Sequence, residues 1–369
     1  MVASISARGG VEATLGYYEH LGRDDYYVRG GEPPGAWAGE GAARLALSGP
    51  VTRSDLEATL KGIDSRSGAR LAALGGKLQN HTAGWDITFS APKSVSVLWA
   101  LSEPAERTGI ERMHRDAVAS ATAHLERTAA WARRGKAGAI RERTAGLVMV
   151  RFDHHASRDL DPQLHSHVLV LNLAPRKDGT WGAIVSRELY KAQKQAGAVY
   201  RAALAVKLER MGHAVERTRD SFRVTAIPLH VERAFSKRRQ AIEAAAEAHG
   251  YRSAKGMELA ALRTRRAKRD VRREALFEAW RNEAQGHGFD LQRDLTVQSR
   301  DNMPVSAGKA QITSLPASPA AVLAVTNPAA RLERAADRLA SAAGVLNQRA
   351  EMPGLAVKLD QHRHERDRR

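Results

Sequence analysis

Two apolar segments joined by a short polar stretch constrain the fold of this chain more than any other feature. Residues 146–154 and 164–173 are apolar at positions that would face both sides of a β-strand, which is typical of strands inside a sheet covered on both faces. About ten polar, turn-prone residues connect them, a length that suits antiparallel pairing. The sequence therefore predicts a β-hairpin in the interior of a sheet.

Hydrophobic periodicity predicts further elements around this hairpin. Helices are expected over 11–21, 52–62 (with Thr52 as N-cap), 104–134, 187–211 and much of 228–287, and strands over 85–90 and 222–225. The Gly- and Pro-rich residues 28–50 are expected to form a loop. Beyond about residue 290 the chain changes character. One helix is expected over 328–343 and a disordered end over 360–369.

Three histidines fall on the predicted hairpin. His165 and His167 are two residues apart on one strand, so both imidazoles point to the same face. His154 ends the neighbouring strand and lies beside them in an antiparallel pair, whereas His155 points to the opposite face and is not expected to be a ligand. Three neutral imidazoles suit Zn, Mn, Fe or Ni and leave positions open for a substrate oxygen. The alternative is that these are ordinary core or surface histidines.

Asp86 lies on the polar face of the strand expected over 85–90. A carboxylate there can hold a ligand histidine in its correct tautomer or accept a proton from a nucleophile. The competing interpretation is a solvated acid at a strand edge. The remaining histidines, such as His20, His81, His114 and His124, show no grouping and are expected at the surface.

Four of the seven tyrosines form two adjacent pairs, Tyr17-Tyr18 and Tyr26-Tyr27. A phenol is a weak nucleophile at neutral pH, but with assistance it forms a covalent phosphotyrosine. Tyr18 completes the apolar stripe of the helix expected over 11–21 and belongs in the core. Tyr17 points about 100° away and is the better nucleophile on geometry. Periodicity does not separate Tyr26 from Tyr27.

The charge balance points to a polyanionic partner. The chain has 58 Lys+Arg against 41 Asp+Glu, a formal net charge of +17. Nucleic acid is the leading partner, an anionic membrane surface the second, and a surplus that serves solubility the alternative. The chain has no cysteine, which excludes disulfides, thiolate metal sites and a Cys nucleophile. No apolar run is long enough to span a membrane and no signal peptide is present, so we expect a cytoplasmic protein without membrane insertion.

Several long motifs resemble one known family. The spacing of the three histidines resembles the metal site of HUH endonucleases, and the doubled tyrosines near the N-terminus resemble the MobF class of conjugative relaxases. Further matching stretches are GWDITFSAPKSVS at 84–96, FDHHASRDLDPQLHSH at 152–167 and GAVYRAALAVKLERMG at 197–212. The resemblance covers roughly residues 1–290 and leaves 291–369 as a divergent tail without a match.

The resemblance implies an α+β fold, with a central antiparallel sheet flanked by helices and a helical C-terminal part closing over DNA. It implies site- and strand-specific nicking of DNA at a transfer origin through a 5′-phosphotyrosine. The implied metal ligands are His154, His165 and His167, holding Mg²⁺ or Mn²⁺, with Zn²⁺ or Ni²⁺ as alternatives. Tyr17 corresponds to the first nucleophile, Tyr26 to the tyrosine of the second transfer and Asp86 to the acid of the site; Tyr18 and Tyr27 are the possible additional tyrosines.

The implied partner is single-stranded DNA of a transfer origin, with accessory DNA-binding proteins and the coupling protein of a secretion channel as further candidates. Lys93 is the best single candidate for a contact to the DNA backbone, because its motif places it close to Asp86. The basic run over 252–273 either contacts phosphates or is a solvated helix face. Its candidate DNA-binding residues are Arg263, Arg265, Arg266, Lys268 and Arg269.

The sequence departs from the family pattern in two places. Relatives usually carry an acidic residue at the position of His155. Many continue into a helicase, whereas this chain has no GxxxxGK[ST] loop, so no nucleotide cofactor is expected and the chain is either a stand-alone or a truncated relaxase. The rival functions are an HUH replication initiator or transposase, a catalytically silent DNA-binding component and, as the weakest, a three-histidine hydrolase of small molecules.

Overall fold

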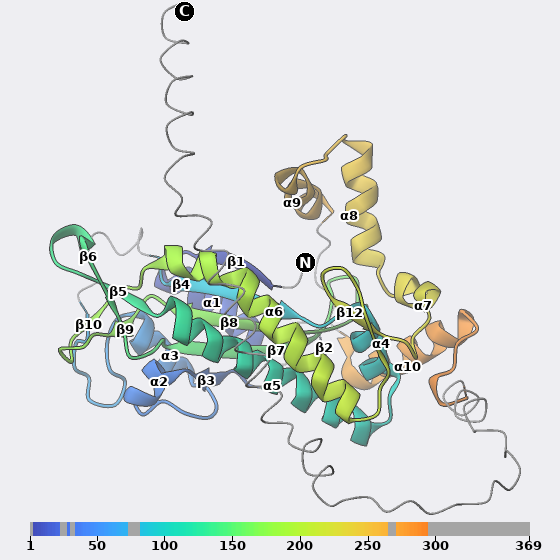
Figure 1. Cartoon of the computed structure of the whole chain (residues 1–369), viewed down its shortest axis with the longest axis horizontal. Helices are drawn as coiled ribbons and strands as arrows, with labels where there is room; N and C mark the ends of the chain where they lie inside the picture. Colours follow the sequence, from blue (N-terminus) through green and yellow to red (C-terminus); the bar gives the residue numbers. More distant parts are fainter. Residues whose placement is uncertain (1–2, 23–27, 30–33, 73–81, 265–270, 294–369) are drawn as a thin grey trace, which may run out of the picture. The chain divides into compact units, whose positions relative to one another are not determined.

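A five-stranded antiparallel sheet forms the centre of the fold (Figure 1). The computed structural model describes residues 3–22, 28–29, 34–72, 82–264 and 271–293. The strand order is β1 (Ala3–Arg8), β4 (Gly84–Ser90), β8 (Pro162–Leu171), β7 (Met149–Ala156) and β3 (Ala36–Ala38). The predicted α+β class with a central antiparallel sheet is confirmed.

The predicted hairpin is strands β7 and β8, which lie inside the sheet between β4 and β3. Their register pairs His154 with His165 and Phe152 with His167, with an irregularity between His154 and Ala156. Strand β4 pairs with the other side of β8, so that Thr88 lies opposite His167. Strand alternation therefore brings residues of three strands to one face of the sheet.

Helices cover the opposite face. Helices α5 (Pro104–Ala129) and α6 (Ser186–Arg210) lie side by side, and α4 (Lys93–Leu101) packs against β8 (Figure 1). Ile87 and Val168, which point to this side, are fully buried. The helix predicted to reach residue 134 ends earlier, because the chain turns into the ribbon β5 (Trp131–Arg134) and β6 (Ile140–Arg143). The turn η2 (Lys136–Gly138) between them uses the positive φ angles of Gly135 and Gly138.

The face that carries the histidines meets the N-terminal helix α1 (Val11–Gly22), which contacts α3 (Arg53–Leu60). The predicted stripe of α1 is buried, and Thr52 caps α3 by accepting from the Asp55 amide. The prediction of a loop over 28–50 is wrong in part. That region contains β2 (Val28–Arg29), β3 and α2 (Glu40–Arg44), because Trp37 pairs with β7 and the Gly41 amide bonds to Leu147.

The C-terminal part of the described chain is mainly helical, as expected. It contains α7 (Leu229–Ala234), α8 (Lys237–Ala248), α9 (Ala254–Arg263) and α10 (Arg273–Gly286). The short strand pairs are β9 (Ala174–Pro175) with β10 (Trp181–Gly182), β11 (Val215–Arg217) with β12 (Phe222–Val224), and β13 (Val271–Arg272) with β2.

Several predictions fall on residues that the structure does not describe. They concern Tyr26, Tyr27, His81, Arg265, Arg266, Lys268, Arg269, the side chain of His20 and the tail. The division of the chain at residue 290 stays a prediction for the same reason. Within the described residues, none of the helices combines the length and the apolar character needed to cross a membrane.

Candidate metal centre

The three predicted histidines form a triangle on the open face of the hairpin. The ring centroids of His154, His165 and His167 are 5.3 Å apart in every pair. Three imidazoles around one tetrahedral ion, with metal–nitrogen bonds of about 2.1 Å, have centroids about 5 Å apart. Among the described residues, no group of three or more His, Cys, Asp or Glu side chains is arranged so that it could hold a metal ion without rearrangement. The spacing of the rings, rather than a preassembled cage, is what fits an ion.

Hydrogen bonds fix which ring nitrogens face the centre of this triangle. Nδ1 of His165 lies 2.8 Å from the carbonyl oxygen of Gln163, and Nδ1 of His167 lies 3.0 Å from each carboxylate oxygen of Asp86. Because both partners only accept hydrogen bonds, each Nδ1 carries a proton, and Nε2 is the nitrogen left to bind a metal. Burial also lowers the pKa of His165 well below its usual range. Both rings are therefore held in the tautomer that binds a metal through Nε2.

Asp86 is 1% exposed and links His167 to the guanidinium of Arg8 through hydrogen bonds. It accepts hydrogen bonds from His167, from the Arg8 guanidinium and from Thr88 Oγ1 at 3.3 Å. Burial alone would raise the pKa of Asp86, but His167 and Arg8 outweigh it and lower the pKa to about 2. Such a carboxylate stays ionised and is a weak base. Of its two predicted roles, the geometry favours orienting His167 over accepting a proton from a nucleophile.

Tyr17 lies at the edge of the histidine triangle. Its ring meets that of His167 edge to face, with centroids 6.3 Å apart, and the guanidinium carbon of Arg8 lies 3.9 Å from its ring centroid. Arg8 thus bridges Asp86 and Tyr17 and places a positive charge over the Tyr17 ring. Sequence reasoning missed Arg8, although the alternation Ser4, Ser6, Arg8 on β1 was a usable signal.

Tyr18 belongs to the core, as predicted. It is 1% exposed and stacks on Phe152 with ring centroids 4.7 Å apart. Burial raises the pKa of the Tyr18 phenol well above its usual value, with Asp86 acting in the same direction. Adjacent positions on one helix therefore give the two tyrosines of this pair different surroundings.

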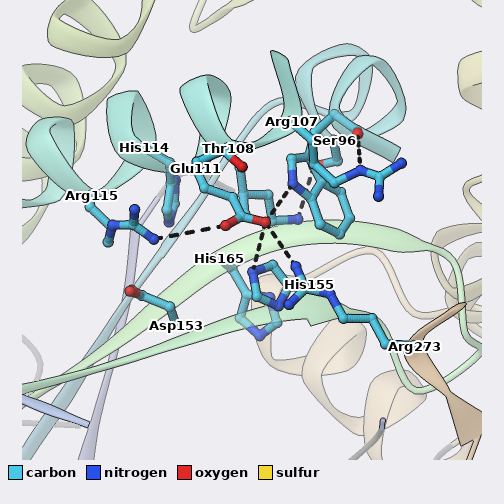
Figure 2. A network of polar contacts seen from close by, with 12 residues as sticks. Ser96, Arg107, Thr108, Glu111, His114, Arg115, Asp153, His155, His165 and Arg273 are labelled. Carbon is cyan, nitrogen blue, oxygen red and sulfur yellow. Dashed lines mark hydrogen bonds and ion pairs between the residues drawn. The ribbon is translucent and has the colours of Figure 1, made fainter. Parts of the chain in front are cut away.

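His155 lies on the helix-covered side of the sheet, where Figure 2 shows it below Glu111 of α5. Its ring stacks on Trp99 with centroids 5.0 Å apart, and its Nε2 lies 3.7 Å from Glu111 Oε1. The same Glu111 oxygen accepts hydrogen bonds from Trp99 Nε1 at 3.0 Å and from Arg273 at 2.9 Å. Glu111 thus connects α4, α5, β7 and α10 directly behind the hairpin.

Two other predictions need correction or detail. The expectation of a surface His114 is wrong, because this side chain is 1% exposed between α5, α6 and β8. Lys93 is half-buried and donates to the Pro162 carbonyl at 2.8 Å; burial lowers its pKa to about 8, although the carboxylates of Asp161 and Glu232 act in the opposite direction. Lys93 lines a cavity of about 390 Å³ together with Ser90, Gln163 and Arg238. Arg263 is exposed at the end of α9.

A histidine triangle beside a tyrosine on an antiparallel sheet provides the groups of a metal-assisted transesterase with a tyrosine nucleophile. The family model described as TrwC relaxase matches residues 11–287. The chain belongs to the TrwC relaxase family.

Two curated relatives carry the name multifunctional conjugation protein TraI. One, from Escherichia coli, is 33% identical over 306 residues, and one, from Escherichia coli strain K12, is 32% identical over the same length. Each match covers 78% of this chain but 16% of the relative. The chain thus spans a small part of the length of these proteins.

Solved structures of the conjugative relaxase TrwC in complex with oriT DNA are similar to this chain over most of its length. A copper-bound and a metal-bound complex each show 33% identity and a TM-score of 0.69. A complex with a 27-mer DNA comprising the recognition hairpin and the cleavage site shows 31% identity and the same TM-score. Each match covers 78% of this chain and 99% of the solved chain.

Proposed function

We propose that this chain cuts one strand of DNA at a specific site of a transfer origin and keeps the new 5′ end on Tyr17. The observation that carries the proposal is the position of Tyr17 between Arg8 and the histidine triangle. In the reaction, the Tyr17 oxygen forms a bond to phosphorus and the bond from phosphorus to the 3′ oxygen breaks. The proton that the Tyr17 hydroxyl loses balances the one that the 3′ oxygen takes up, and because one phosphodiester replaces another, the step can reverse.

His154, His165 and His167 would hold a divalent ion, which draws negative charge from the scissile phosphate. Mg²⁺ or Mn²⁺ is the proposed working ion, although three imidazoles also accept Zn²⁺ and Ni²⁺. Arg8 stabilises the Tyr17 phenolate and adds positive charge near the phosphate. Asp86 holds Arg8 and His167 in place.

The position of Tyr17 also gives the DNA a direction. In an in-line displacement the leaving oxygen lies opposite the attacking one. On the sheet face, Tyr17 lies at the Asp86 and His167 end, whereas the cavity lined by Ser90 and Gln163 lies at the His165 end. The nucleotide that carries the leaving 3′ oxygen therefore belongs in this cavity, beside Lys93.

The proposed function also includes a cellular compartment, a DNA substrate and protein partners. We place the reaction in the cytoplasm, with single-stranded transfer-origin DNA as the substrate and accessory DNA-binding proteins and a coupling protein as partners. Tyr26 would perform a second transfer at the end of the process. The net charge of +17 supports a nucleic acid partner, and no step needs a nucleotide cofactor.

The test uses purified protein, labelled single-stranded oligonucleotides from candidate transfer origins, and Mn²⁺ or Mg²⁺. A denaturing gel should show a protein–DNA adduct that disappears with EDTA and with Tyr17→Phe but persists with the matched variant Tyr18→Phe. Salt-dependent binding of every oligonucleotide without an adduct would instead favour a catalytically silent DNA-binding component. An adduct that survives Tyr17→Phe would assign the nucleophile to another tyrosine.

A further inference from the structure

A chain of buried polar groups crosses from the helices to the back of the histidine hairpin. His114 of α5 lies with Nδ1 2.8 Å from the Tyr200 hydroxyl of α6 and with Nε2 2.9 Å from Ser166 Oγ of β8. Ser166 Oγ in turn lies 2.5 Å from Asp153 Oδ1 of β7. Figure 2 shows His114 pointing from its helix toward the strand that carries Asp153. All four side chains are buried, on the face opposite the metal ligands.

The proton positions in this chain follow from its acidic end. Asp153 pairs with Arg151 Nε at 3.1 Å, so its carboxylate accepts and Ser166 must donate to it. The Ser166 oxygen then accepts the Nε2 proton of His114. Nδ1 of His114 keeps its lone pair and accepts from the Tyr200 hydroxyl. One neutral tautomer satisfies every group, in accord with burial, which lowers the pKa of His114 to about 4.

This chain ends on the backbone that holds the metal ligands. Ser166 lies between His165 and His167, and Asp153 immediately precedes His154. Asp153 and Ser166 are cross-strand partners, one position away from the pair His154 and His165. Because side chains alternate across a strand, the hydrogen bonds and the ligands grip opposite faces of the same backbone. A displacement of Ser166 must therefore move the Cα atoms of its two histidine neighbours.

We propose that His114 is a positioning residue for the metal centre, acting through Ser166 from the far side of the sheet. The inference rests on the proposed function for its metal, and it adds a residue that touches neither metal nor DNA. His114 anchors the hairpin to α5 and α6 and fixes the spacing of the three rings. Loss of a group that orients a ligand lowers metal affinity by up to about 10–100-fold, and this more distant contact should change it about threefold to tenfold.

The experiment is calorimetric titration of the full chain with Mn²⁺ alone, beside a thermal unfolding measurement for each variant. Ser166→Ala removes the hydroxyl, Ser166→Thr keeps it, and Tyr200→Phe removes only the outer donor. Ser102→Ala is the matched control, because Ser102 is a buried serine at the C-terminal cap of α4 whose hydroxyl donates to the Leu98 carbonyl, outside the network. We expect weaker Mn²⁺ binding for Ser166→Ala and Tyr200→Phe, with recovery in Ser166→Thr and no change in Ser102→Ala.

Two outcomes would overturn the inference. If Ser166→Ala binds Mn²⁺ with wild-type affinity, the network does not position the metal ligands. If Ser166→Ala and Ser102→Ala lose equal Mn²⁺ affinity, the effect reflects general stability and not the network. Failure of the proposed function looks different. If the wild type forms no DNA adduct while the variants still weaken Mn²⁺ binding as expected, the nicking proposal fails and the positioning role stands. If the wild type binds no Mn²⁺, both fail.

Discussion

Both carboxylate oxygens of Asp86 lie 3.0 Å from Nδ1 of His167, so the ring of His167 is held symmetrically against a buried negative charge. The second partner of this charge is Arg8, which also covers the face of Tyr17. One carboxylate thus controls the tautomer of a candidate ligand and the position of the cation beside the candidate nucleophile. Its replacement should affect metal binding and strand cleavage separately.

Asp86→Asn tests this double role. The amide presents a donor as well as an acceptor, so it no longer imposes the Nδ1–H tautomer on His167 and no longer neutralises Arg8. We expect Mn²⁺ affinity to fall about 10–100-fold, and single-turnover cleavage to fall further because Tyr17 loses its ordered cation. Calorimetry and a cleavage time course measure the two effects. Unchanged Mn²⁺ affinity would show that Asp86 does not orient the ligand.

The two tyrosines of α1 should differ in stability as well as in chemistry. Tyr18→Ala empties a fully buried site against Phe152 and should lower the free energy of unfolding by about 3–5 kcal/mol. Tyr17→Ala, at a half-buried position, should cost about 1 kcal/mol, near the average for point substitutions. Urea denaturation of the metal-free protein measures both values. Equal losses would contradict the assignment of Tyr18 to the core.

The buried His114 gives stability a defined pH dependence. Its pKa is lowered to about 4 in the folded protein, against about 6.5 in an unfolded chain. Between these values the unfolded chain binds a proton that the folded protein excludes, so this contribution is complete above pH 6.5 and is lost as pH falls toward 4. The expected loss is about 3 kcal/mol.

The control for this pH dependence is His249, an exposed histidine on the same chain. His114→Gln should reduce the slope of the stability curve between pH 6.5 and 4, since it removes one titrating group, whereas His249→Gln should not reduce it. Denaturant midpoints at five pH values in this window suffice. An unchanged slope in His114→Gln would assign the pH dependence to other buried groups, such as His155 and His165.

Lys93 and Arg263 are the two predicted DNA contacts that the structure describes. If each neutralises one phosphate, Lys93→Met and Arg263→Met should each reduce the slope of log affinity against log salt by about one. Lys207→Met is a suitable control, because Lys207 is bound to Asp116 on the helical layer. Filter binding of a single-stranded oligonucleotide at four salt concentrations measures the slopes. An unchanged slope in Lys93→Met would show that Lys93 does not neutralise a phosphate and that its role is the hydrogen bond to the Pro162 carbonyl.

The sequence predicted the histidine triangle well because its geometry is local. His154, His165 and His167 belong to one hairpin, so strand alternation and register alone bring them together. For Arg8, the alternation on β1 could have indicated the face of the sheet but not the partner, since Asp86 is 78 positions away and β1 is a short strand of mixed character. His114 was misjudged because its burial depends on Tyr200 and Ser166, which only the packing of helices on the sheet brings near.

The loop prediction over 28–50 failed for a related reason. Strand β3 has three residues, too few for a periodic signal, and it exists because β7 offers it an edge to pair with. Gly41 packs so closely on Leu147 that a Cβ there would lie 2.6 Å from a backbone carbon. The sequence is rich in glycine here, but Gly41 permits close packing rather than a loop.

Strand β1 is an edge strand, and α1 follows it directly, so Arg8 and Tyr17 belong to a peripheral unit while the histidines lie in the interior. Edge elements open locally at a lower free energy than central strands, and their amides exchange with solvent sooner. Detachment of this unit would carry Tyr17 away without breaking the β7–β8 ladder. Metal affinity and the ability to cleave DNA therefore have different thermal limits, and cleavage should be lost first on warming.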